Sequence, residues 1–430
     1  MNGSLLVLGG AVSGVAAARL GLRLGYDVAV YDLDPAVIDQ LDVDVRTHAG
    51  AWQSEWLNGA DLVVSSPGIP PHAPPVVDAL SGSAPVVSEL EFGSAHLEAP
   101  YVAVTGTNGK TTVAESTADM MIADGLRACA AGNVGLAVSD IALDPWDAVA
   151  IEASSFQLQL IDRFHPRAAA ILNIAPDHLD WHGGFEPYVA AKLRITENQT
   201  SDDILAFDPA DEVVADATIS TAARRVPVSG GRRPVDGNGP DDGSLWIGDH
   251  AYPVPKLDPV WLYDLTVAAT LSSAVGVGPL GIQTVFERFE PGPHRRQIAG
   301  VANGVTWIND SKATNPHAAM ASICAYDSVV LIAGGRNKDL DLGPMLTMPN
   351  LRHVFAVGES AVEMEAVGGN LVTIVADLAD AVDKSAEIAG PGDTVLLAPG
   401  CASFDMFSSY AERGREFTEL VEQKLGSGDE

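Results

Sequence analysis

The stretch AVTGTNGKTT, residues 103–112, joins a β-branched run to an alanine-rich segment that reads as a helix. Gly106 and Gly109 let backbone amides converge on a phosphate, Lys110 supplies a mobile positive charge, and the Thr111 hydroxyl can reach Mg²⁺. A strand, a glycine-rich turn and a helix in this order predict a nucleotide phosphate loop. The predicted ligands of the phosphates are Gly106, Thr107, Asn108, Gly109, Lys110, Thr111 and Thr112.

Outward from this loop, short β-branched runs alternate with alanine-rich stretches along all 430 residues, which is typical of parallel α/β units. A proline precedes a fresh buried strand near residue 98, and proline and glycine cluster near residue 292, so we expect three domains, residues 1–98, 99–294 and 295–430. The fold class that we predict is α/β, with Rossmann-like domains at both ends and a central phosphate-loop domain. We expect residues 229–244 to form a polar surface loop.

The charge balance excludes several classes of partner. Lysine and arginine number 25 against 57 acidic residues, a net charge of -32, which argues against binding a nucleic-acid backbone or an anionic membrane. No window approaches the ~18 to 20 uninterrupted apolar residues of a membrane span. The three cysteines are odd in number and far apart, which fits a reducing cytoplasm. We therefore expect a cytoplasmic protein that binds anions in local cationic pockets.

The N-terminal segment VLGGAVSGVAAARL places Gly9 and Gly14 at a strand-to-helix turn, and Asp32 ends the next predicted strand. This resembles a dinucleotide fingerprint with Ala11 in place of the middle glycine. A site for a nucleotide diphosphate and an ordinary tight turn are both open alternatives. Gly68, in a second strand-end turn, could approach the same ligand.

Polar side chains follow the predicted strands of the central domain. Asn133 stands in AGNVG, Glu152 ends a strand in VAIEASSFQL, and His178 follows one in ILNIAPDHLDWHG. The carboxyl ends of parallel strands are where α/β sheets place ligands and metals. Glu152 and His178 are the metal ligands that we predict on this ground.

These strings, TGTNGKTT, GNVG, EASSFQL, DHLDWHG and YVAAK, follow one another within one domain and resemble those of the Mur ligases. The resemblance implies an enzyme that couples ATP hydrolysis, with Mg²⁺, to amide formation on a UDP-linked muramoyl peptide. In the C-terminal domain NDSKATN and CASFDMF resemble the members of the family that use D-glutamate, so the implied partners are D-glutamate, UDP-N-acetylmuramoyl-L-alanine and ATP. We expect a monomer.

The resemblance also implies roles for individual residues. Arg295 and Asp310 would lie beside ATP, and Lys312 would face the transferring phosphate. The residues implied for D-glutamate are Thr314, Lys338, Ser403, Phe404 and Tyr410. Those implied for the UDP substrate are Val12, Ser13, Asp32, Leu33, Gly68 and Asn133.

Two departures from the family pattern concern its nucleotides. Leu33 and Asp34 stand where the family has threonine and arginine, the arginine helping to hold the UDP part. WLYDLTVAAT stands where the family usually has an HNxxN pattern near the adenine, and we read Leu262 and Leu265 as the replacements of its asparagines. Adenine contacts must then come from other atoms.

The expected chemistry is activation of a carboxylate as an acyl phosphate, which the amine of D-glutamate then attacks. Lys110 and Mg²⁺ would neutralise charge during phosphoryl transfer, and Asn133 and the loop amides would stabilise the oxyanion. The catalytic residues that we predict are Lys110, Asn133, His178, Lys192 and Lys312. The predicted metal site comprises Thr111, Glu152, His178 and Lys192, the last as a carbamate.

Lys192, in EPYVAAKLRITEN, has two interpretations. Helical spacing places it on one face with Tyr188 and Thr196, and an ordinary ion pair with Glu186 or Glu197 is the simpler role. A bare ammonium facing Mg²⁺ would repel the metal, whereas a carbamate is an anion. The resemblance implies such a carbamylated lysine at this position.

Alternative functions remain at this stage. One is another amino-acid ligase of the same fold, of the folylpolyglutamate or poly-glutamate type. The other is a nucleotide-dependent oxidoreductase, which would rest on residues 9–32 alone and would leave the phosphate loop unexplained.

Overall fold

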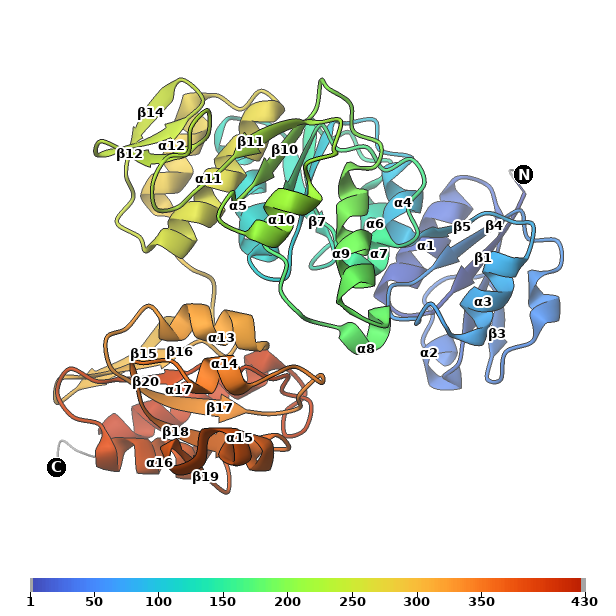
Figure 1. Ribbon diagram of the computed structural model, residues 1–430. Coiled ribbons are helices and arrows are strands. Elements are labelled where there is room, and N and C mark those ends of the chain that lie inside the picture. The colour runs from blue at the N-terminus through green and yellow to red at the C-terminus, as the bar shows by residue number, and fades with distance from the viewer. Residues whose placement is uncertain (1–2, 427–430) are drawn as a thin grey trace. The chain divides into compact units, whose positions relative to one another are not determined.

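The computed structural model describes residues 3–426. The chain forms two compact units (Figure 1). The first comprises Met1–Ile174 and Glu186–Phe289, and the second comprises Ala175–Phe185 and Glu290–Glu430. No helix among the described residues is long and apolar enough to cross a membrane.

The first unit begins with a parallel five-stranded sheet in the order β3-β2-β1-β4-β5. Its strands are β1 (Ser4–Leu8), β2 (Asp27–Asp32), β3 (Arg46–Ala49), β4 (Leu62–Ser65) and β5 (Val86–Ser88). The accompanying helices are α1 (Val12–Arg23), α2 (Pro35–Asp39), η1 (Ser54–Leu57), α3 (Pro74–Ser81) and α4 (Glu89–Ser94). Apolar cores cover both faces of the sheet, which explains why its strands read as continuous apolar runs.

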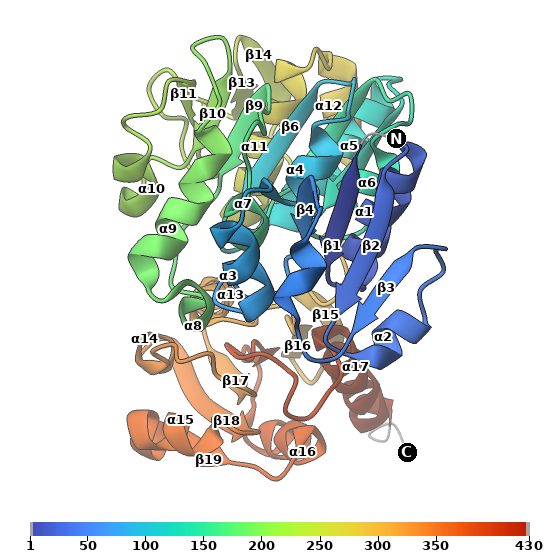
Figure 2. The same cartoon turned by 90° about the vertical axis from the view of Figure 1, so that its right-hand side faces the viewer.

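The same unit continues with a parallel six-stranded sheet in the order β11-β10-β9-β6-β8-β7. Figure 2 labels β11, β10, β9 and β6 of this sheet. Its strands are β6 (Tyr101–Thr105), β7 (Ala128–Gly132), β8 (Ala148–Glu152), β9 (Ala168–Ile171), β10 (Ile204–Phe207) and β11 (Arg224–Pro227). The helices are α5 (Lys110–Ala123), α6 (Val138–Ile141), α7 (Ser155–Leu158), α9 (Phe185–Leu193), η2 (Arg194–Thr196), α10 (Glu212–Ala217), α11 (Pro259–Ala274) and α12 (Pro279–Arg288). Helices α11 and α12 pack against α5.

A three-stranded antiparallel sheet, β12 (Gly239–Asp241), β13 (Ser244–Ile247) and β14 (His250–Pro253), packs onto α11. The prediction that residues 229–244 form a polar surface loop is therefore wrong in its second half. Asn238 is buried there and donates to the Thr270 hydroxyl at 2.7 Å. Such a satisfied side chain lets a polar, glycine-rich segment pack.

Two glutamates of α4 bind the following part of the unit. The Glu91 carboxylate accepts from the amides of Asp162, Arg163 and Phe164, each at 3.0 Å. The Glu89 carboxylate accepts from the Ser139 amide at 2.7 Å, and burial raises its pKa to about 7. Helix α4 is thus attached to the central sheet by its side chains as well as by the chain itself.

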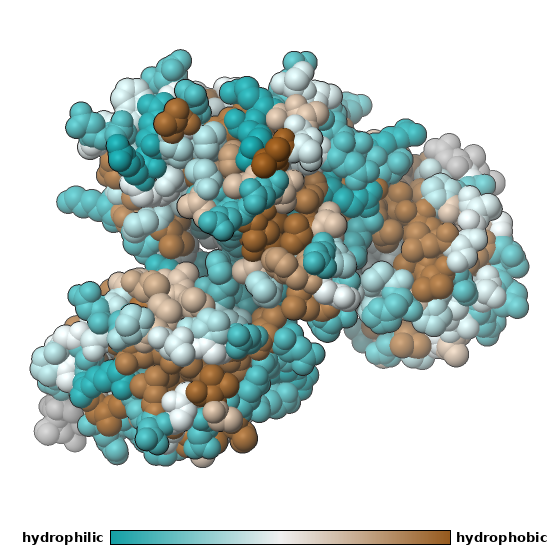
Figure 3. All heavy atoms as spheres, in the orientation of Figure 1, coloured by the Kyte–Doolittle hydropathy of each residue, from teal (hydrophilic) through white to brown (hydrophobic). Residues whose placement is uncertain are grey.

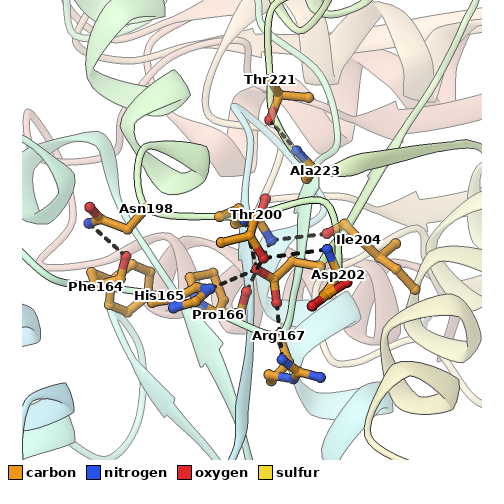
Figure 4. Close-up of polar contacts among 12 residues, drawn as sticks. Phe164, His165, Pro166, Arg167, Asn198, Thr200, Asp202, Ile204, Thr221 and Ala223 are labelled. Carbon is orange, nitrogen blue, oxygen red and sulfur yellow. Dashed lines mark hydrogen bonds and ion pairs between the residues drawn. The ribbon is translucent and has the colours of Figure 1, made fainter.

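A polar network that includes His165, Arg167 and Thr200 holds the amino ends of the central strands (Figure 4). At its centre is the Asp203 carboxylate, which is 0% exposed. It accepts from His165 Nε2 at 2.7 Å and from the amide and hydroxyl of Thr200 at 2.8 and 3.0 Å. Burial alone would raise its pKa, but the bonds from His165 and Thr200 lower it below the ordinary value. This network fixes the amino ends of the strands, whereas the phosphate loop follows the carboxyl end of β6.

The second unit contains a six-stranded sheet in the order β15-β16-β20-β17-β18-β19, in which only β15 runs antiparallel to its neighbour. Its strands are β15 (Gln297–Ala302), β16 (Val305–Asn309), β17 (Val329–Gly334), β18 (Leu351–Val357), β19 (Val372–Ile374) and β20 (Thr394–Leu397). The helices are α8 (Leu179–His182), α13 (Pro316–Ile323), α14 (Gly343–Leu346), α15 (Ala361–Gly368), η3 (Gly369–Leu371), α16 (Leu378–Ile388) and α17 (Tyr410–Gly426). Figure 3 shows hydrophilic surface interrupted by apolar patches on each unit.

Candidate functional site

The phosphate loop between β6 and α5 requires glycine at its last position. Gly109 has φ of 89°, a left-handed conformation that favours glycine. A Cβ there would lie 2.9 Å from Asp264 Oδ1 and 2.9 Å from Leu172 Cδ1. The loop therefore packs directly against α11 and the end of β9.

Asn173, which we did not single out from the sequence, holds the loop in place. Its carbonyl oxygen Oδ1 accepts from the Asn108 amide at 2.9 Å, and its Nδ2 donates to the Asn108 carbonyl at 3.1 Å. Its backbone carbonyl accepts from the Thr107 amide at 2.9 Å. The available signal was its position directly after the buried strand β9, which lies beside β6.

Two lysines converge on one carbonyl oxygen of the loop. Lys110 Nζ donates to Gly106 at 2.9 Å and to Thr107 at 3.0 Å, and Lys192 Nζ donates to Gly106 at 2.7 Å. Lys192 is 2% exposed, and its ammonium lies 4.6 Å from the centre of the Tyr188 ring. The predicted shared face of Lys192 and Tyr188 is confirmed.

Of the two glutamates considered as ion-pair partners of Lys192, Glu197 pairs with Arg194. The Tyr188 hydroxyl lies 3.0 Å from Thr107 Oγ1, so the helix that carries Lys192 is itself attached to the phosphate loop.

Glu152 ends β8 next to the loop strand and is buried. Its Oε1 accepts from Asn133 Nδ2 at 2.8 Å, whereas its buried Oε2 has no hydrogen-bond partner among residues 3–426. A buried carboxylate oxygen without a partner is costly, and a Mg²⁺ ion coordinated by this oxygen, Thr111 and water would remove that cost. The residues present therefore fit a magnesium ion, although no three His, Cys, Asp or Glu side chains of the described chain form a metal-binding group.

His178 belongs to the second unit, unlike Glu152 and Lys192. It has φ of 52° at the start of α8. The neighbouring Asp177 pairs with Lys338 Nζ at 3.0 Å and accepts from Asn315 Nδ2 at 3.3 Å. Burial alone would raise the pKa of Asp177, but the charges of Lys338 and His178 lower it below its ordinary value.

The loops after β16, β17 and β20 carry the residues implied for D-glutamate. Thr314 follows β16, Lys338 follows β17, and Ser403 and Phe404 follow β20. Ser403 is buried, whereas Phe404 is 65% exposed. These loops leave the carboxyl ends of neighbouring parallel strands, so the fold brings their residues to one edge of the sheet.

Arg413, which we missed, binds two of these loops. Its guanidinium donates to the Ser311 hydroxyl and carbonyl, each at 3.0 Å, and to the Cys401 carbonyl at 3.3 Å. Burial lowers its pKa to about 10. Its neighbour Tyr410 starts α17, and the Lys312 ammonium lies 4.1 Å from the centre of the Tyr410 ring.

Asp310 and Arg295, implied for ATP, lie in the second unit at the start of its sheet. Asp310 is buried, and burial raises its pKa above the ordinary value. The Ser322 hydroxyl and the Arg296 guanidinium oppose this shift without cancelling it. Its carboxylate accepts from the Arg296 amide at 3.3 Å. Arg295 is half-buried.

The residues implied for the UDP substrate surround the turn after β1. Asp32 accepts from the Gly10 amide at 2.8 Å and so fixes the glycine turn. A Cβ at Gly14 would lie 1.7 Å from the Gly9 carbonyl oxygen, so only glycine fits there. Val12 and Leu33 are 73% and 70% exposed, Ser13 is half-buried and Gly68 is exposed.

Asp34, one of the departures, has a local structural role. Its carboxylate accepts from the Ala36 amide at 2.9 Å and caps α2, whose first residue is Pro35. Aspartate is a favoured N-cap, and proline a favoured first helical residue.

The second departure lies on α11. Leu262 and Leu265 are both buried, and Leu265 packs in the apolar core of the central sheet. Asp264 instead lies against Gly109, and Trp261 precedes it by three residues. The helix phase thus turns Asp264, rather than Leu265, toward the phosphate loop.

Three family descriptions match the chain. Residues 3–88 match the Mur ligase MurD-like N-terminal domain, residues 104–229 the Mur ligase middle domain, and residues 294–401 the Mur ligase glutamate ligase domain.

Among curated proteins, the chain is 40% identical to a UDP-N-acetylmuramoylalanine--D-glutamate ligase from Frankia casuarinae, over 98% of this chain and 94% of that protein. It is 39% identical to the ligase of that name from Thermobifida fusca, over 86% of both. Among solved structures, a pseudomurein peptide ligase type C from Methanothermus fervidus has a TM-score of 0.62 at 17% identity, covering 98% of this chain and all of that one. The MurF ligase from Thermotoga maritima in complex with ADP has a TM-score of 0.60 at 16% identity, covering 94% and 96%.

Proposed function

The chain belongs to the Mur ligase family, and on that premise we propose how its residues carry out the reaction. It is an ATP-dependent ligase that adds D-glutamate to UDP-N-acetylmuramoyl-L-alanine in peptidoglycan synthesis, and the curated relatives that it matches carry the name UDP-N-acetylmuramoylalanine--D-glutamate ligase. The rival interpretations, a glutamate ligase of the folate type and an oxidoreductase, are set aside on this ground.

We propose that the acceptor carboxylate attacks the γ-phosphorus of ATP, giving an acyl phosphate and ADP. The D-glutamate amine then attacks the acyl carbon and expels phosphate. The observation that carries this proposal is the convergence of Lys110 and Lys192 on the Gly106 carbonyl, beside the buried Glu152 carboxylate. Phosphoryl transfer depends mainly on positioning and on charge stabilisation of this kind.

In this proposal Lys110 leaves the loop carbonyls and binds the transferring phosphoryl group. Lys110 and Lys312 offset its negative charge, and Asn133, held by Glu152, is a donor to the oxyanion. Glu152 Oε2 and the Thr111 hydroxyl would hold Mg²⁺, which supplies charge neutralisation when bound. His178 as a further ligand stays a prediction.

For Lys192 we propose a carbamate formed with carbon dioxide. A carbamylated amine keeps one N–H, so the bond to the Gly106 carbonyl can survive the modification. The contact with the Tyr188 ring, by contrast, favours the ammonium. The modification can be read directly as a 44-dalton mass increase removed by acid, or as a ¹³C signal after growth in labelled bicarbonate.

For D-glutamate we propose that Thr314 and Lys338 hold one carboxylate and that Ser403, with the backbone near Phe404 and the Tyr410 ring, holds the other. Lys338 now pairs with Asp177. The carboxylate of D-glutamate would therefore either displace the Asp177 carboxylate from Lys338 or bind Lys338 together with it.

Phosphate release measured with UDP-N-acetylmuramoyl-L-alanine, ATP and a panel of amino acids tests the function. We expect release with D-glutamate and little with L-glutamate or L-lysine. Equal release with L-glutamate would contradict the proposed carboxylate contacts. We also propose that the protein acts in the cytoplasm as a monomer, which size-exclusion chromatography with light scattering measures.

A further inference from the structure

Two consecutive peptide groups of the phosphate loop are held from both sides. In the group between Gly106 and Thr107, the carbonyl accepts from Lys110 at 2.9 Å and the N–H donates to the backbone carbonyl of Asn173 at 2.9 Å. In the next group, the Thr107 carbonyl accepts from Lys110 at 3.0 Å and the Asn108 N–H donates to Asn173 Oδ1 at 2.9 Å. The N–H and the carbonyl of a trans peptide group point in opposite directions. Lys110 and Asn173 therefore hold the loop from opposite sides.

Asn173 is itself firmly placed at the end of the central sheet. The residue before it, Leu172, accepts from the Tyr263 hydroxyl at 3.0 Å through its carbonyl. The residue after it, Ile174, donates its amide to the Asp211 carboxylate at 3.1 Å. The half-buried side chain of Asn173 thus extends toward the loop from a backbone that is fixed on both sides.

The two sides of the loop differ in what happens to them during the reaction. Lys110, in the proposed mechanism, leaves the loop carbonyls for the transferring phosphoryl group. The Gly106 carbonyl keeps its bond to Lys192, but the Thr107 carbonyl loses its bond to Lys110. The second peptide group is then held by Asn173, whose amide is uncharged and is bonded to both backbone groups of Asn108.

We propose that Asn173 is a positioning residue, which keeps the phosphate loop in its binding conformation while Lys110 contacts the transferring phosphoryl group. The inference rests on the proposed phosphoryl transfer from ATP. It adds that the contribution of Asn173 is largest when the third phosphate is present, because ADP lacks the group toward which Lys110 moves. Rotation of an unrestrained peptide group would displace the amides of residues 109–112, which follow it directly in the chain.

The size of the effect follows from the two hydrogen bonds of the Asn173 side chain, one to the Asn108 amide and one to its carbonyl. Two hydrogen bonds of ordinary net strength correspond to a change of about 5- to 100-fold in an equilibrium constant. Since the backbone carbonyl of Asn173 still accepts from Thr107 in any variant, we expect the lower half of that range.

The test is calorimetric titration of the whole protein, with Mg²⁺, using ADP and an ATP analogue that has an imido group between its second and third phosphorus atoms. Asn173→Ala should weaken binding of the analogue by about tenfold and binding of ADP by no more than about twofold. In steady-state kinetics kcat should fall by about tenfold, whereas the KM for D-glutamate should stay within about twofold, because the amino acid is bound by other residues.

Asn198→Ala is the matched control. Asn198 is also a half-buried asparagine of the first unit, and its Nδ2 donates to the backbone carbonyls of Asp162 and Phe164 at 3.0 and 3.2 Å (Figure 4). Its loss should leave the affinities for both nucleotides and kcat unchanged. Asn173→Asp is a second variant, of the same size as the natural residue, should Asn173→Ala fail to fold. Its second oxygen would face the Asn108 carbonyl, so it should also weaken the analogue more than ADP.

Two results overturn the inference while leaving the proposed function intact. Equal weakening of ADP and the analogue by Asn173→Ala would show that Asn173 only shapes the loop and has no particular role when Lys110 moves. Unchanged binding of both nucleotides would show that the loop does not depend on this side chain. Absence of binding of either nucleotide to the unchanged protein would overturn both the inference and the use of ATP. A thermal melt of each variant shows whether weaker binding reflects unfolding.

Discussion

The lysines of the two units differ in what faces their ammonium groups. In the first unit Lys110 and Lys192 lie against a neutral carbonyl, and Lys192 also faces an aromatic ring. In the second unit Lys338 pairs with the ionised Asp177. A neutral carbonyl does not offset the charge of an ammonium, whereas a carboxylate partner cancels most of it. Lysines that face a carbonyl are suited to binding the phosphates of a nucleotide. A lysine that is already paired with a carboxylate, as Lys338 is, is suited to binding an amino acid weakly.

The largest expected effect tests the first half of this comparison. Lys110→Ala removes a positive charge from beside the transferring phosphoryl group, so kcat should fall by about 10²- to 10³-fold or more. Circular dichroism should stay unchanged. The matched control is Lys384→Ala, which breaks a half-buried pair with Asp380 on α16 and should keep wild-type turnover. Normal turnover of Lys110→Ala in a folded protein would remove this lysine from the mechanism.

The second largest effect is expected from substitution of Lys192, which tests whether this side chain is positively or negatively charged during the reaction. If it is a carbamate, Lys192→Ala should lose most activity, about 10²-fold by the same reasoning about charge stabilisation. Added acetate should restore part of it by supplying a carboxylate. Lys192→Arg should stay inactive, because a guanidinium cannot become that anion.

The control for rescue is Lys110→Ala, which acetate should not restore. Full activity of Lys192→Arg would exclude the carbamate and place Lys192 beside Lys110 as a second cation.

A smaller effect tests the second half of the comparison. Asp177→Asn leaves Lys338 without its carboxylate, so the KM for D-glutamate should fall by about threefold to tenfold, the size of a weak charge pair. Because the pKa of Asp177 is held below its ordinary value, its contribution is present above that range and is lost only as the pH falls through the lowered pKa. KM of the unchanged enzyme should therefore show no step from Asp177 between about pH 6 and 9.

A rise in KM for Asp177→Asn would reverse this interpretation and make Asp177 the residue that positions Lys338. Steady-state kinetics with varied D-glutamate distinguishes the two results.

The smallest expected effect concerns Asp34, which lies next to the turn predicted to bind the UDP substrate. Asp34→Ala removes the cap of α2, which costs about 1 kcal/mol, so Tm should fall by about 2–4 °C. Asp34→Asn keeps a capping side chain and should keep the Tm. Asp34→Arg should lose the cap yet tighten the UDP substrate by adding a positive charge. Weaker substrate binding in both Asp34→Arg and Asp34→Ala would show that the cap itself supports the substrate turn.

The sequence predicted the α/β class and three-domain fold correctly because both depend on local signals. Alternating apolar runs and the loop TGTNGKTT are each contained in a few consecutive residues. Residues that act through distant partners were missed for the same reason. Asn173 holds a loop 65 positions away, and Arg413 holds Ser311 across 102 positions. Lys192 was singled out through the string YVAAK, because the resemblance to the Mur ligases implies a carbamylated lysine at that position.

The helix phase of α11 shows a third limit. An apolar stretch such as WLYDLTVAAT does not reveal which of its residues faces a ligand, because it is buried nearly all round. Only packing shows that Leu265 belongs to the core and Asp264 to the loop.

The attachment of α4 has a consequence for the order in which the chain folds during synthesis. The amides that bind the Glu91 carboxylate belong to residues 71 to 73 positions later in the chain. At about 5–20 residues per second, the ribosome makes that stretch in roughly 4–15 s. During that interval the completed N-terminal strands carry a carboxylate that has yet to meet its donors. A chaperone or a pause in translation would act on this enzyme most strongly in that interval.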